Sequence, residues 1–269
     1  TYLGNYSANL TLLMHMNGAE AGTTFTDETG KTVTRYGNTK TVQTTKVLGN
    51  ASGYFDGNGD YLSLADSDDW YFGTGDFTFS LWVNFTTLPA TSNAMRFWSQ
   101  RVDTNNEQDF YVFNNAGTYY IYYVVVSGGS NIVVFSNAVT VSTDTQYQFV
   151  ISKTSNVYRL YQNGTKIGSD YTKSDAIPNY AAPLLIGQKI SGYYINGYID
   201  ELAFWNGVAI PISELYPQSY EVGGVLSPVA SFTTNVTSGA APLAVQFNDT
   251  STNTPTSWNW SFGDGNYST

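Results

Sequence analysis

The stretch GYFDGNGDYLSL, residues 53–64, decides between two folds. Acidic and amide side chains alternate with glycine from Asp56 to Asp60, as in the first half of an EF-hand calcium loop. Such a loop also needs glycine at its sixth position and glutamate at its twelfth, where this chain has Tyr61 and Ser67. We therefore interpret DGNGD as a hairpin turn between two strands, with the glycines supplying the positive φ that the turn requires.

Outward from this stretch, the chain reads as a succession of short strands. Aromatic and β-branched residues alternate with polar ones, and turn signals such as NNAG, SGGSN and QNGTK separate the runs. Asn163-Gly164 predicts a type I′ hairpin, and one short helix is expected at 212–216, after Pro211. The clearest predicted strands are 77–85, 109–114, 119–126, 132–135, 146–152 and 157–162. This pattern predicts an all-β sandwich or barrel.

The composition agrees with that fold and excludes several functions. Tyr, Phe and Trp make 16% of the 269 residues and charged residues only 12%, a mix that suits half-buried strands and polar loops. A net charge of −10 without a basic run excludes nucleic acid as an expected partner. No apolar stretch is long enough for membrane insertion. Cysteine is absent, and the chain starts at Thr1 without a signal peptide, so we interpret it as a mature or trimmed form.

Asn-X-Ser/Thr sequons bear on where the protein acts. Together with the low charge they favour an extracellular, cell-surface or virion-surface protein. A chain this rich in Asn, Ser and Thr also forms such triplets by chance. The predicted glycosylation sites are Asn5, Asn9, Asn50, Asn84, Asn163, Asn235, Asn248, Asn259 and Asn266.

Four ordered blocks resemble the laminin-G-like, concanavalin A-like lectin/glucanase jelly roll. They are LLMHMNGA (12–19), GYFDGNGDYLSLADSDDWYFGTGDFTFSLWVNF (53–85), YRLYQNGTKIG (158–168) and LLIGQKISGYYINGYIDELAFWNGVAI (184–210). The resemblance covers nearly all of residues 1–222. It implies two packed antiparallel sheets, in a protein that binds carbohydrate or protein or serves as a spacer.

A second resemblance follows a Gly- and Pro-containing linker at 223–228. PVASFTTNVTSGAAPLAVQFNDTSTNTPTSWNWSFGDG (228–265) resembles the start of a PKD domain, an immunoglobulin-like module, but the later strands of that family are missing from 229–269. Trp258, Trp260 and Phe262 alternate and should form one apolar face that needs a cover. We expect a second copy of the chain, a continuation of it or the first domain to complete this half-module. The first of these would produce self-assembly.

An enzyme is not expected, although resembling proteins include glucanases. Those enzymes carry a Glu-X-Asp-X-Glu strand whose carboxylates act as nucleophile and acid/base. Neither Glu107-Gln108-Asp109 nor Asp200-Glu201 supplies the third carboxylate. The single histidine, His15, is expected to be a packed, hydrogen-bonded residue of the first strand rather than a catalytic base.

The first resemblance also implies a calcium ion. In resembling proteins, carbonyls near the first strand and the FDG turn bind it together with an aspartate of the last strand. The matching positions are Asn17, Gly57 to Asp60, and Asp200. Resembling proteins often have Asp where this chain has Asn17, which lowers the expected affinity. The alternative is that Asp60 only caps the turn and Asp200 only accepts backbone hydrogen bonds.

Side-chain parity along the strands predicts a carbohydrate site on one outer surface. Aromatic rings stack on sugar rings, and tyrosine hydroxyls add hydrogen bonds without charge. The alternative for the tryptophan in this set is a place in the core. The predicted residues are Arg96, Trp98, Tyr111, Tyr120, Tyr122 and Tyr161.

The expected function is therefore a non-enzymatic surface module that binds a glycan or a surface protein. Two alternatives stay open. One is a structural subunit of a surface filament, sheath, virion decoration or tail fibre. The other is the accessory module of a larger secreted carbohydrate-active enzyme.

Overall fold

The computed structural model describes residues 6–190, 192–215, 230–251, 257–262 and 267–268. The chain divides into a large unit, Tyr2–Tyr220, and a small unit, Glu221–Thr269 with Thr1. The predicted boundary at 222 and the linker at 223–228 lie outside the described residues. No described helix is long and apolar enough to cross a membrane.

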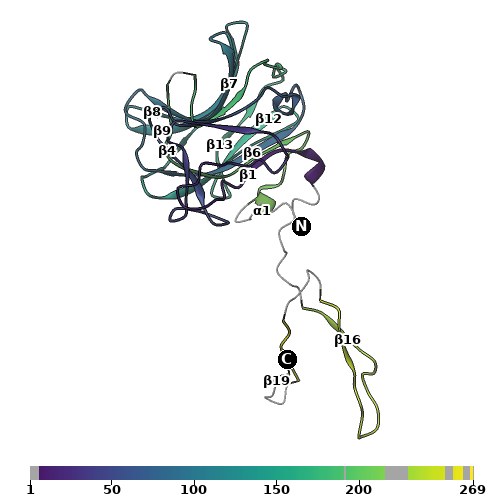
Figure 1. Ribbon diagram of the computed structural model, residues 1–269. Helices are drawn as coiled ribbons and strands as arrows, with labels where there is room; N and C mark the ends of the chain where they lie inside the picture. The colour runs from purple at the N-terminus through teal and green to yellow at the C-terminus, as the bar shows by residue number, and fades with distance from the viewer. Residues whose placement is uncertain (1–5, 191, 216–229, 252–256, 263–266, 269) are drawn as a thin grey trace. The chain divides into compact units, whose positions relative to one another are not determined.

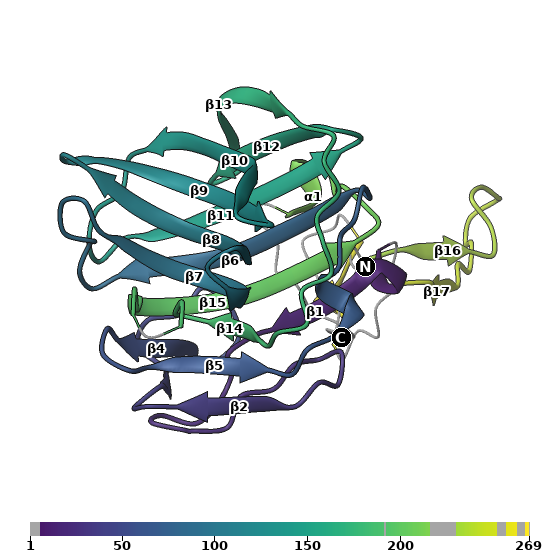
Figure 2. The same ribbon diagram turned by 90° about the horizontal axis from the view of Figure 1, so that it is seen from above.

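The large unit is a sandwich of two antiparallel sheets (Figure 1). In the eight-stranded sheet the order is β13 (Thr165–Thr172), β12 (Val157–Gln162), β11 (Gln146–Thr154), β6 (Phe77–Phe85), β15 (Asn196–Asn206), β4 (Ser52–Asp56) and β3 (Lys40–Val42), with β1 (Leu10–Met14) also paired to β15. In the seven-stranded sheet it is β10 (Ser130–Val139), β9 (Thr118–Ser127), β8 (Asn106–Asn115), β7 (Ala94–Asp103), β14 (Leu184–Ile186), β5 (Tyr61–Leu64) and β2 (Val33–Tyr36). Figure 2 shows the two sheets stacked face to face. The predicted all-β sandwich is confirmed.

Most predicted elements are present with similar bounds. Strands β6 and β12 span the residues predicted for them. Asn163 and Gly164 join β12 to β13 with φ values of 50° and 75°, as a type I′ turn requires. The short helix is α1 (Ile212–Leu215), and Tyr216 lies outside the described residues. Two short 3-10 turns, Ser7–Asn9 and Asp68–Trp70, complete the large unit.

The DGNGD segment is a turn, but the predicted hairpin is wrong. Strand β4 before it belongs to the eight-stranded sheet, and β5 after it belongs to the seven-stranded sheet. Gly57 and Gly59 adopt the expected positive φ, 83° and 77°. The segment therefore carries the chain from one sheet to the other. Its local sequence specifies the turn, whereas long-range packing decides which sheet each flanking strand joins.

One aromatic core fills the space between the sheets. Phe79 of β6 lies 5.0 Å from Trp98 of β7 and 4.9 Å from Phe204 of β15, measured between ring centroids. All three side chains are fully buried. Burying a phenylalanine stabilises the fold by roughly 1.5–3 kcal/mol, and edge-to-face contacts such as Phe79–Trp98 add to that.

A smaller apolar cluster covers the outer face of the eight-stranded sheet. Val150 of β11 and Trp205 of β15 point away from the main core and contact Leu215 of α1 and Ile210. The chain after β15 thus folds back over this sheet and closes its outer face.

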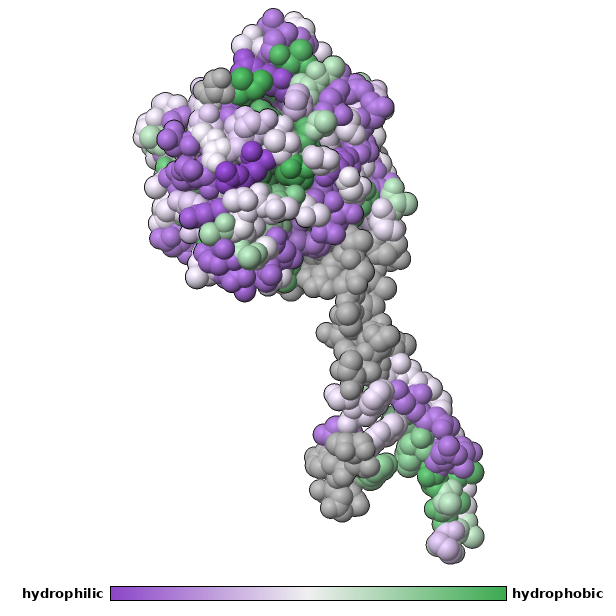
Figure 3. Space-filling view, in the orientation of Figure 1, coloured by the Kyte–Doolittle hydropathy of each residue, from purple (hydrophilic) through white to green (hydrophobic). Residues whose placement is uncertain are grey.

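The small unit contains two strand pairs, β16 (Phe232–Thr234) with β17 (Phe247–Asp249) and β18 (Trp260–Ser261) with β19 (Tyr267–Ser268). The ring of Phe247 lies 6.0 Å from that of Trp260 and 5.2 Å from that of Phe262. With Trp258 these rings line an open cleft of about 300 Å³. Hydrophobic residues lie on the surface of this unit (Figure 3), where Phe262 is 50% exposed. The PKD resemblance and the completion of this unit by another segment stay predictions.

Candidate functional site

Three residues form a row across the outer face of the seven-stranded sheet. Arg96 of β7 is paired with Tyr111 of β8, which is paired with Tyr122 of β9. The guanidinium carbon of Arg96 lies 3.8 Å from the centroid of the Tyr111 ring. The rings of Tyr111 and Tyr122 stack at 5.1 Å with an interplanar angle of 6°. Cation–π and cross-strand aromatic contacts hold this aromatic row in place.

Further aromatic residues border the aromatic row. Tyr120 lies 6.2 Å from Tyr122 on the same strand. Tyr193, in the segment after β14, lies 4.8 Å from the guanidinium of Arg96 and is 50% exposed. No hydrogen bond joins the hydroxyls of Tyr111, Tyr120 or Tyr122 to another described residue. These hydroxyls are therefore available to a ligand.

Charged residues lie beside the aromatic row on the same face. Lys189 Nζ donates to Glu107 Oε1 at 2.7 Å and lies 2.8 Å from Asp109 Oδ2. Arg101 Nε lies 3.1 Å from Glu107 Oε2, and Arg96 Nε lies 3.4 Å from Asp109 Oδ2. Asp109 and Glu107 are almost fully buried. Opposite charges in direct contact allow these carboxylates to stay beneath the surface.

Tyr111 of the row stays neutral because it is buried. Burial raises the pKa of Tyr111 to about 12, although the charge of Arg96 acts in the opposite direction. The phenol is therefore protonated at any physiological pH. It can donate a hydrogen bond as well as accept one.

The predicted position of Trp98 on this surface is wrong. Trp98 is fully buried in the aromatic core, and so is its neighbour Phe97. A β-bulge between Arg96 and Trp98 inserts one extra residue into β7, because Arg96 faces Tyr111 whereas Trp98 faces Phe110. A bulge resets the alternation of side chains. Parity counted through it therefore assigned the tryptophan to the wrong face.

The predicted position of Tyr161 is wrong for a different reason. Tyr161 does point outward, but it lies on β12 of the eight-stranded sheet, opposite Val150. It packs there against the apolar cluster of Trp205 and Leu215. Parity assigns a face within a strand and cannot tell which of two sheets the strand belongs to. The structure thus brings together Arg96, Tyr111, Tyr120 and Tyr122, four of the six predicted residues.

A hollow of about 270 Å³ adjoins the aromatic row at one end of the sandwich. Tyr193 and Met95 border it from the side of the row, and Gly57, Pro89 and Asn196, the first residue of β15, also line it. Small-molecule sites start at about this volume, about 300 Å³. Tyr193 borders both the row and the hollow, so one ligand could contact both.

The side-chain oxygens of Asn17 and Asp60, which were matched to a calcium site, accept hydrogen bonds in the structure. Asn17 Oδ1 accepts the backbone N–H of Asn50 at 2.7 Å. Asp60 accepts the backbone N–H groups of Asn38 and Asp56. Calcium needs six to eight oxygen ligands, whereas these oxygens already accept N–H donors. Calcium binding stays a prediction, which melting curves with calcium and with a chelator would test.

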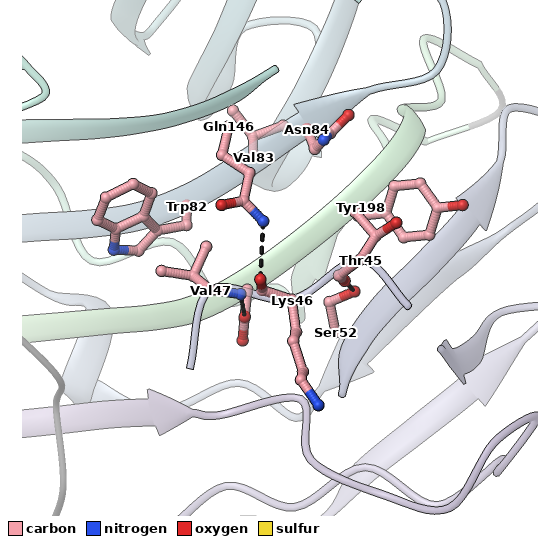
Figure 4. A pocket seen from close by; sticks show the side chains of 10 residues that line it. Thr45, Lys46, Val47, Ser52, Trp82, Val83, Asn84, Gln146 and Tyr198 are labelled. Carbon is pink, nitrogen blue, oxygen red and sulfur yellow. Dashed lines mark hydrogen bonds between the residues drawn. The ribbon is translucent and has the colours of Figure 1, made fainter. Parts of the chain in front are cut away.

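Asp200 is also satisfied by backbone groups. Its Oδ2 accepts the N–H of Val47 at 2.7 Å, and its Oδ1 accepts the N–H of Glu201 at 2.9 Å. Burial raises the pKa of Asp200 to about 8. Figure 4 shows the segment of Thr45, Lys46 and Val47. The Lys46 carbonyl there accepts a hydrogen bond from Gln146 Nε2 at 2.8 Å. The cleft there has a volume of only about 10 Å³, too small for an organic ligand.

His15 follows β1 by one residue and is hydrogen-bonded, as expected. Its Nδ1 lies 2.8 Å from Glu201 Oε1, and the side chain of Glu201 is buried. Burial lowers the pKa of His15, but the hydrogen bond and charge of Glu201 outweigh this and raise it overall. The Asp200-Glu201 pair thus binds backbone and histidine groups. The Glu107 and Asp109 pair binds lysine and arginine.

The sequons vary in their surroundings. Asn5 and Asn266 lie outside the described residues. Asn9 Nδ2 donates to the carbonyl of Asn206 at 2.9 Å, and the side chain of Asn84 has a buried oxygen. Asn259 is exposed. Glycosylation at the predicted positions stays a prediction.

Comparison with known families identifies the large unit. Residues 56–211, more than half of the chain, match the model described as the concanavalin A-like lectin/glucanases superfamily. The chain belongs to this superfamily. No curated protein matches it.

Solved structures of the same fold include two toxin binding domains and one domain of an arabinanase. The binding domain of Paraclostridial mosquitocidal protein 1 has a TM-score of 0.57 and 13% identity, and the match covers 78% of this chain and 51% of that one. Domain 4 of an extracellular GH43 arabinanase from Geobacillus stearothermophilus, solved with arabinotriose, has a TM-score of 0.55 and 16% identity. The match covers 77% of this chain and 96% of that domain. The botulinum neurotoxin serotype G binding domain has a TM-score of 0.58 and 12% identity. The match covers 77% of this chain and 50% of that domain.

This member of the concanavalin A-like superfamily spans about half the length of the toxin domains it matches. At such low identities the likeness shows the fold alone. Residue roles therefore depend on the geometry of this chain.

Sequence reasoning missed Lys189, Asp109 and Tyr193 as parts of the outer face. Lys189 and Tyr193 lie between β14 and β15, in a turn closed by mutual backbone hydrogen bonds between Lys189 and Gly192. The sequence KISGYY at 189–194 could have indicated this surface, because a glycine and two adjacent tyrosines in a loop are typical of binding sites. The side chains of Lys189 and Tyr193 reach β7 and β8 only through tertiary folding.

Proposed function

We propose that the large unit is a non-enzymatic glycan-binding module and that the aromatic row, with Tyr120 and Tyr193, is its binding surface. The observation that carries this proposal is the row of Arg96 and adjacent tyrosine rings on one face, whose hydroxyls have no hydrogen-bond partner among the described residues. Sugars present hydroxyls and apolar C–H faces together. Tyrosine rings and hydroxyls match both features.

The surroundings of the row support the same proposal. The adjoining hollow would admit a sugar that extends beyond the row, and the ion pairs beneath it fix the side chains before a ligand arrives. Pre-ordered side chains lower the entropy lost on binding. The similarity in fold to an arabinanase domain solved with arabinotriose agrees with this function. It also suits the alternative of an accessory module in a larger enzyme. We propose an extracellular or particle-surface location, where such glycans occur.

A glycan array followed by calorimetry tests the proposal. The whole chain should bind at least one glycan class, and Tyr122→Ala should lower that affinity by at least about tenfold. Tyr161→Ala is the matched control, because Tyr161 lies on the outer face of the other sheet and should leave affinity unchanged. Failure to bind any glycan would refute the function. Equal losses in both variants would refute the assigned face.

The small unit supports a second candidate, assembly through its open aromatic cleft. Phe232, Phe247, Trp258, Trp260 and Phe262 line that cleft, and several of these rings are about half exposed. Exposed aromatic clusters of this kind often mark interaction sites. Sedimentation of the whole chain and of a Trp260→Ser variant tests this candidate. A monomer at high concentration in both would count against self-assembly.

A further inference from the structure

Arg96 has hydrogen-bonding capacity that its neighbours do not use. Its side chain is 8% exposed, and its Nε makes only a long contact of 3.4 Å with Asp109 Oδ2. Its Nη1 is buried and has no hydrogen-bond partner among the described residues. Buried donors in folded proteins nearly always have a partner, so one without any marks a place for ordered water or a ligand.

The charges around Arg96 leave it incompletely neutralised. Lys189, Arg96 and Arg101 face two carboxylates, Glu107 and Asp109, within this network. Lys189 contacts both carboxylates at 2.7–2.8 Å, and Arg101 contacts Glu107. Arg96 has the longest contact of the three cations. The cluster therefore carries an excess positive charge at Arg96, although the whole chain has a net charge of −10.

The shape of the site suits one kind of anion. Aromatic rings contact the guanidinium at 3.8 Å and 4.8 Å, so its flat surfaces are occupied and its N–H edge is the part left for a ligand. A guanidinium edge matches a planar carboxylate, with two parallel hydrogen bonds. Asp109 Oδ1 also lacks a partner among the described residues and could accept a sugar hydroxyl.

Tyr193 borders the guanidinium from the solvent side. Its ring lies 4.8 Å from the guanidinium carbon, and the side chain is 50% exposed. Because Nη1 is buried, a ligand can reach it only if a neighbouring side chain moves. We include Tyr193 in the proposed site as the exposed neighbour of Arg96.

From these observations we propose that the ligand is an acidic glycan and that Arg96 binds its carboxylate, as found in uronic and sialic acids. The proposal rests on the glycan-binding function proposed above and adds the chemical class of the ligand. The tyrosine hydroxyls of the aromatic row would bind the neutral part of the same glycan.

Two matched ligand pairs test the proposal on the whole chain. The first pair is trigalacturonate and its methyl ester, and the second is 3′-sialyllactose and lactose. In at least one pair, the acid should bind at least about tenfold more tightly than its neutral partner. This preference should shrink in high salt, because screening weakens the ionic contact.

Variants then assign the preference to Arg96. Arg96→Gln should remove the preference for the acid, whereas Arg159→Gln should keep it, because Arg159 lies on β12 of the other sheet and pairs with Asp170. If Arg96→Gln fails to fold, Arg96→Lys keeps the charge and loses the flat edge. It should lose most of the preference. A preference that persists in the folded Arg96 variant would overturn the proposal.

The outcomes separate this inference from the function on which it rests. Binding of neutral glycans that depends on Tyr122, with no preference for the acid, would overturn the acidic ligand and leave the glycan-binding function intact. Binding of no glycan of either class would overturn both.

Discussion

The two outer faces of the sandwich differ in what covers them. The face of the eight-stranded sheet carries Val150 and Trp205, and α1 with Ile210 closes it. The face of the seven-stranded sheet carries Arg96, Tyr111 and Tyr122, with Lys189 and Tyr193 beside them. Large apolar side chains are stabilised when other parts of the chain bury them, whereas amphipathic and charged side chains can stay in contact with water in the absence of a ligand. The residues on the outer side thus decide which face is structural and which is free to bind.

The largest expected effect comes from opening the closed face. Trp205→Ala should destabilise the large unit by about 3–5 kcal/mol, because it empties a fully buried site between β15 and α1. Urea unfolding measures the change. Tyr122→Ala on the open face is the comparison and should cost less than about 1 kcal/mol. Similar losses in the two variants would contradict the distinction between the faces.

A smaller effect is expected from the ion pairs of the open face. Lys189→Met should destabilise by about 2–3 kcal/mol, because Glu107 and Asp109 lose their shortest cationic contact. The loss should be below the 3–5 kcal/mol of a fully buried pair, since Lys189 is 13% exposed. Glu107→Gln in the Lys189→Met background should recover part of it. An unchanged unfolding midpoint in Lys189→Met would mean that these ion pairs do not support the face.

The closed sheet should also show a pH dependence. Glu201 raises the pKa of His15 in the folded chain, so protonated His15 stabilises the fold below its ordinary value of about 6.5. This stabilisation is lost as the pH rises through the raised value. His15→Gln should therefore cost about 1–2 kcal/mol at pH 5 and less at pH 9. Equal costs at the two pH values would show that folding does not change the pKa of His15.

The smallest effect is expected where the closed sheet has an exposed pair. Arg159 and Asp170 form a salt bridge of 3.0 Å between β12 and β13 in contact with solvent. Exposed pairs contribute little because water and salt screen them. Arg159→Gln should leave the melting temperature unchanged within error. A clear drop would indicate that this edge of the sheet is less solvated than its exposure suggests.

The sequence predicted the fold better than the site for a physical reason. Strands such as β6 and β12 are specified by local alternation and by turns such as Asn163-Gly164, and both signals lie within a few residues. The site depends on which strands become neighbours. Parity predicted that Arg96, Tyr111 and Tyr122 share a surface. They do so because β7, β8 and β9 follow one another in sequence and pair in that order in the sheet. The prediction failed for Tyr161 because β12 lies in the other sheet.

The sequence by itself determined the all-β class and most strand positions, because side-chain alternation and turn chemistry act over a few residues. The family followed from the resemblance of four ordered blocks. Only the tertiary structure decided three further points. It split β4 and β5 between two sheets, it turned Trp98 into the core through a bulge, and it brought Lys189 to Asp109 across 80 residues of chain. Each depends on contacts between segments far apart in sequence. Such contacts form only where the packing of the whole core makes them favourable.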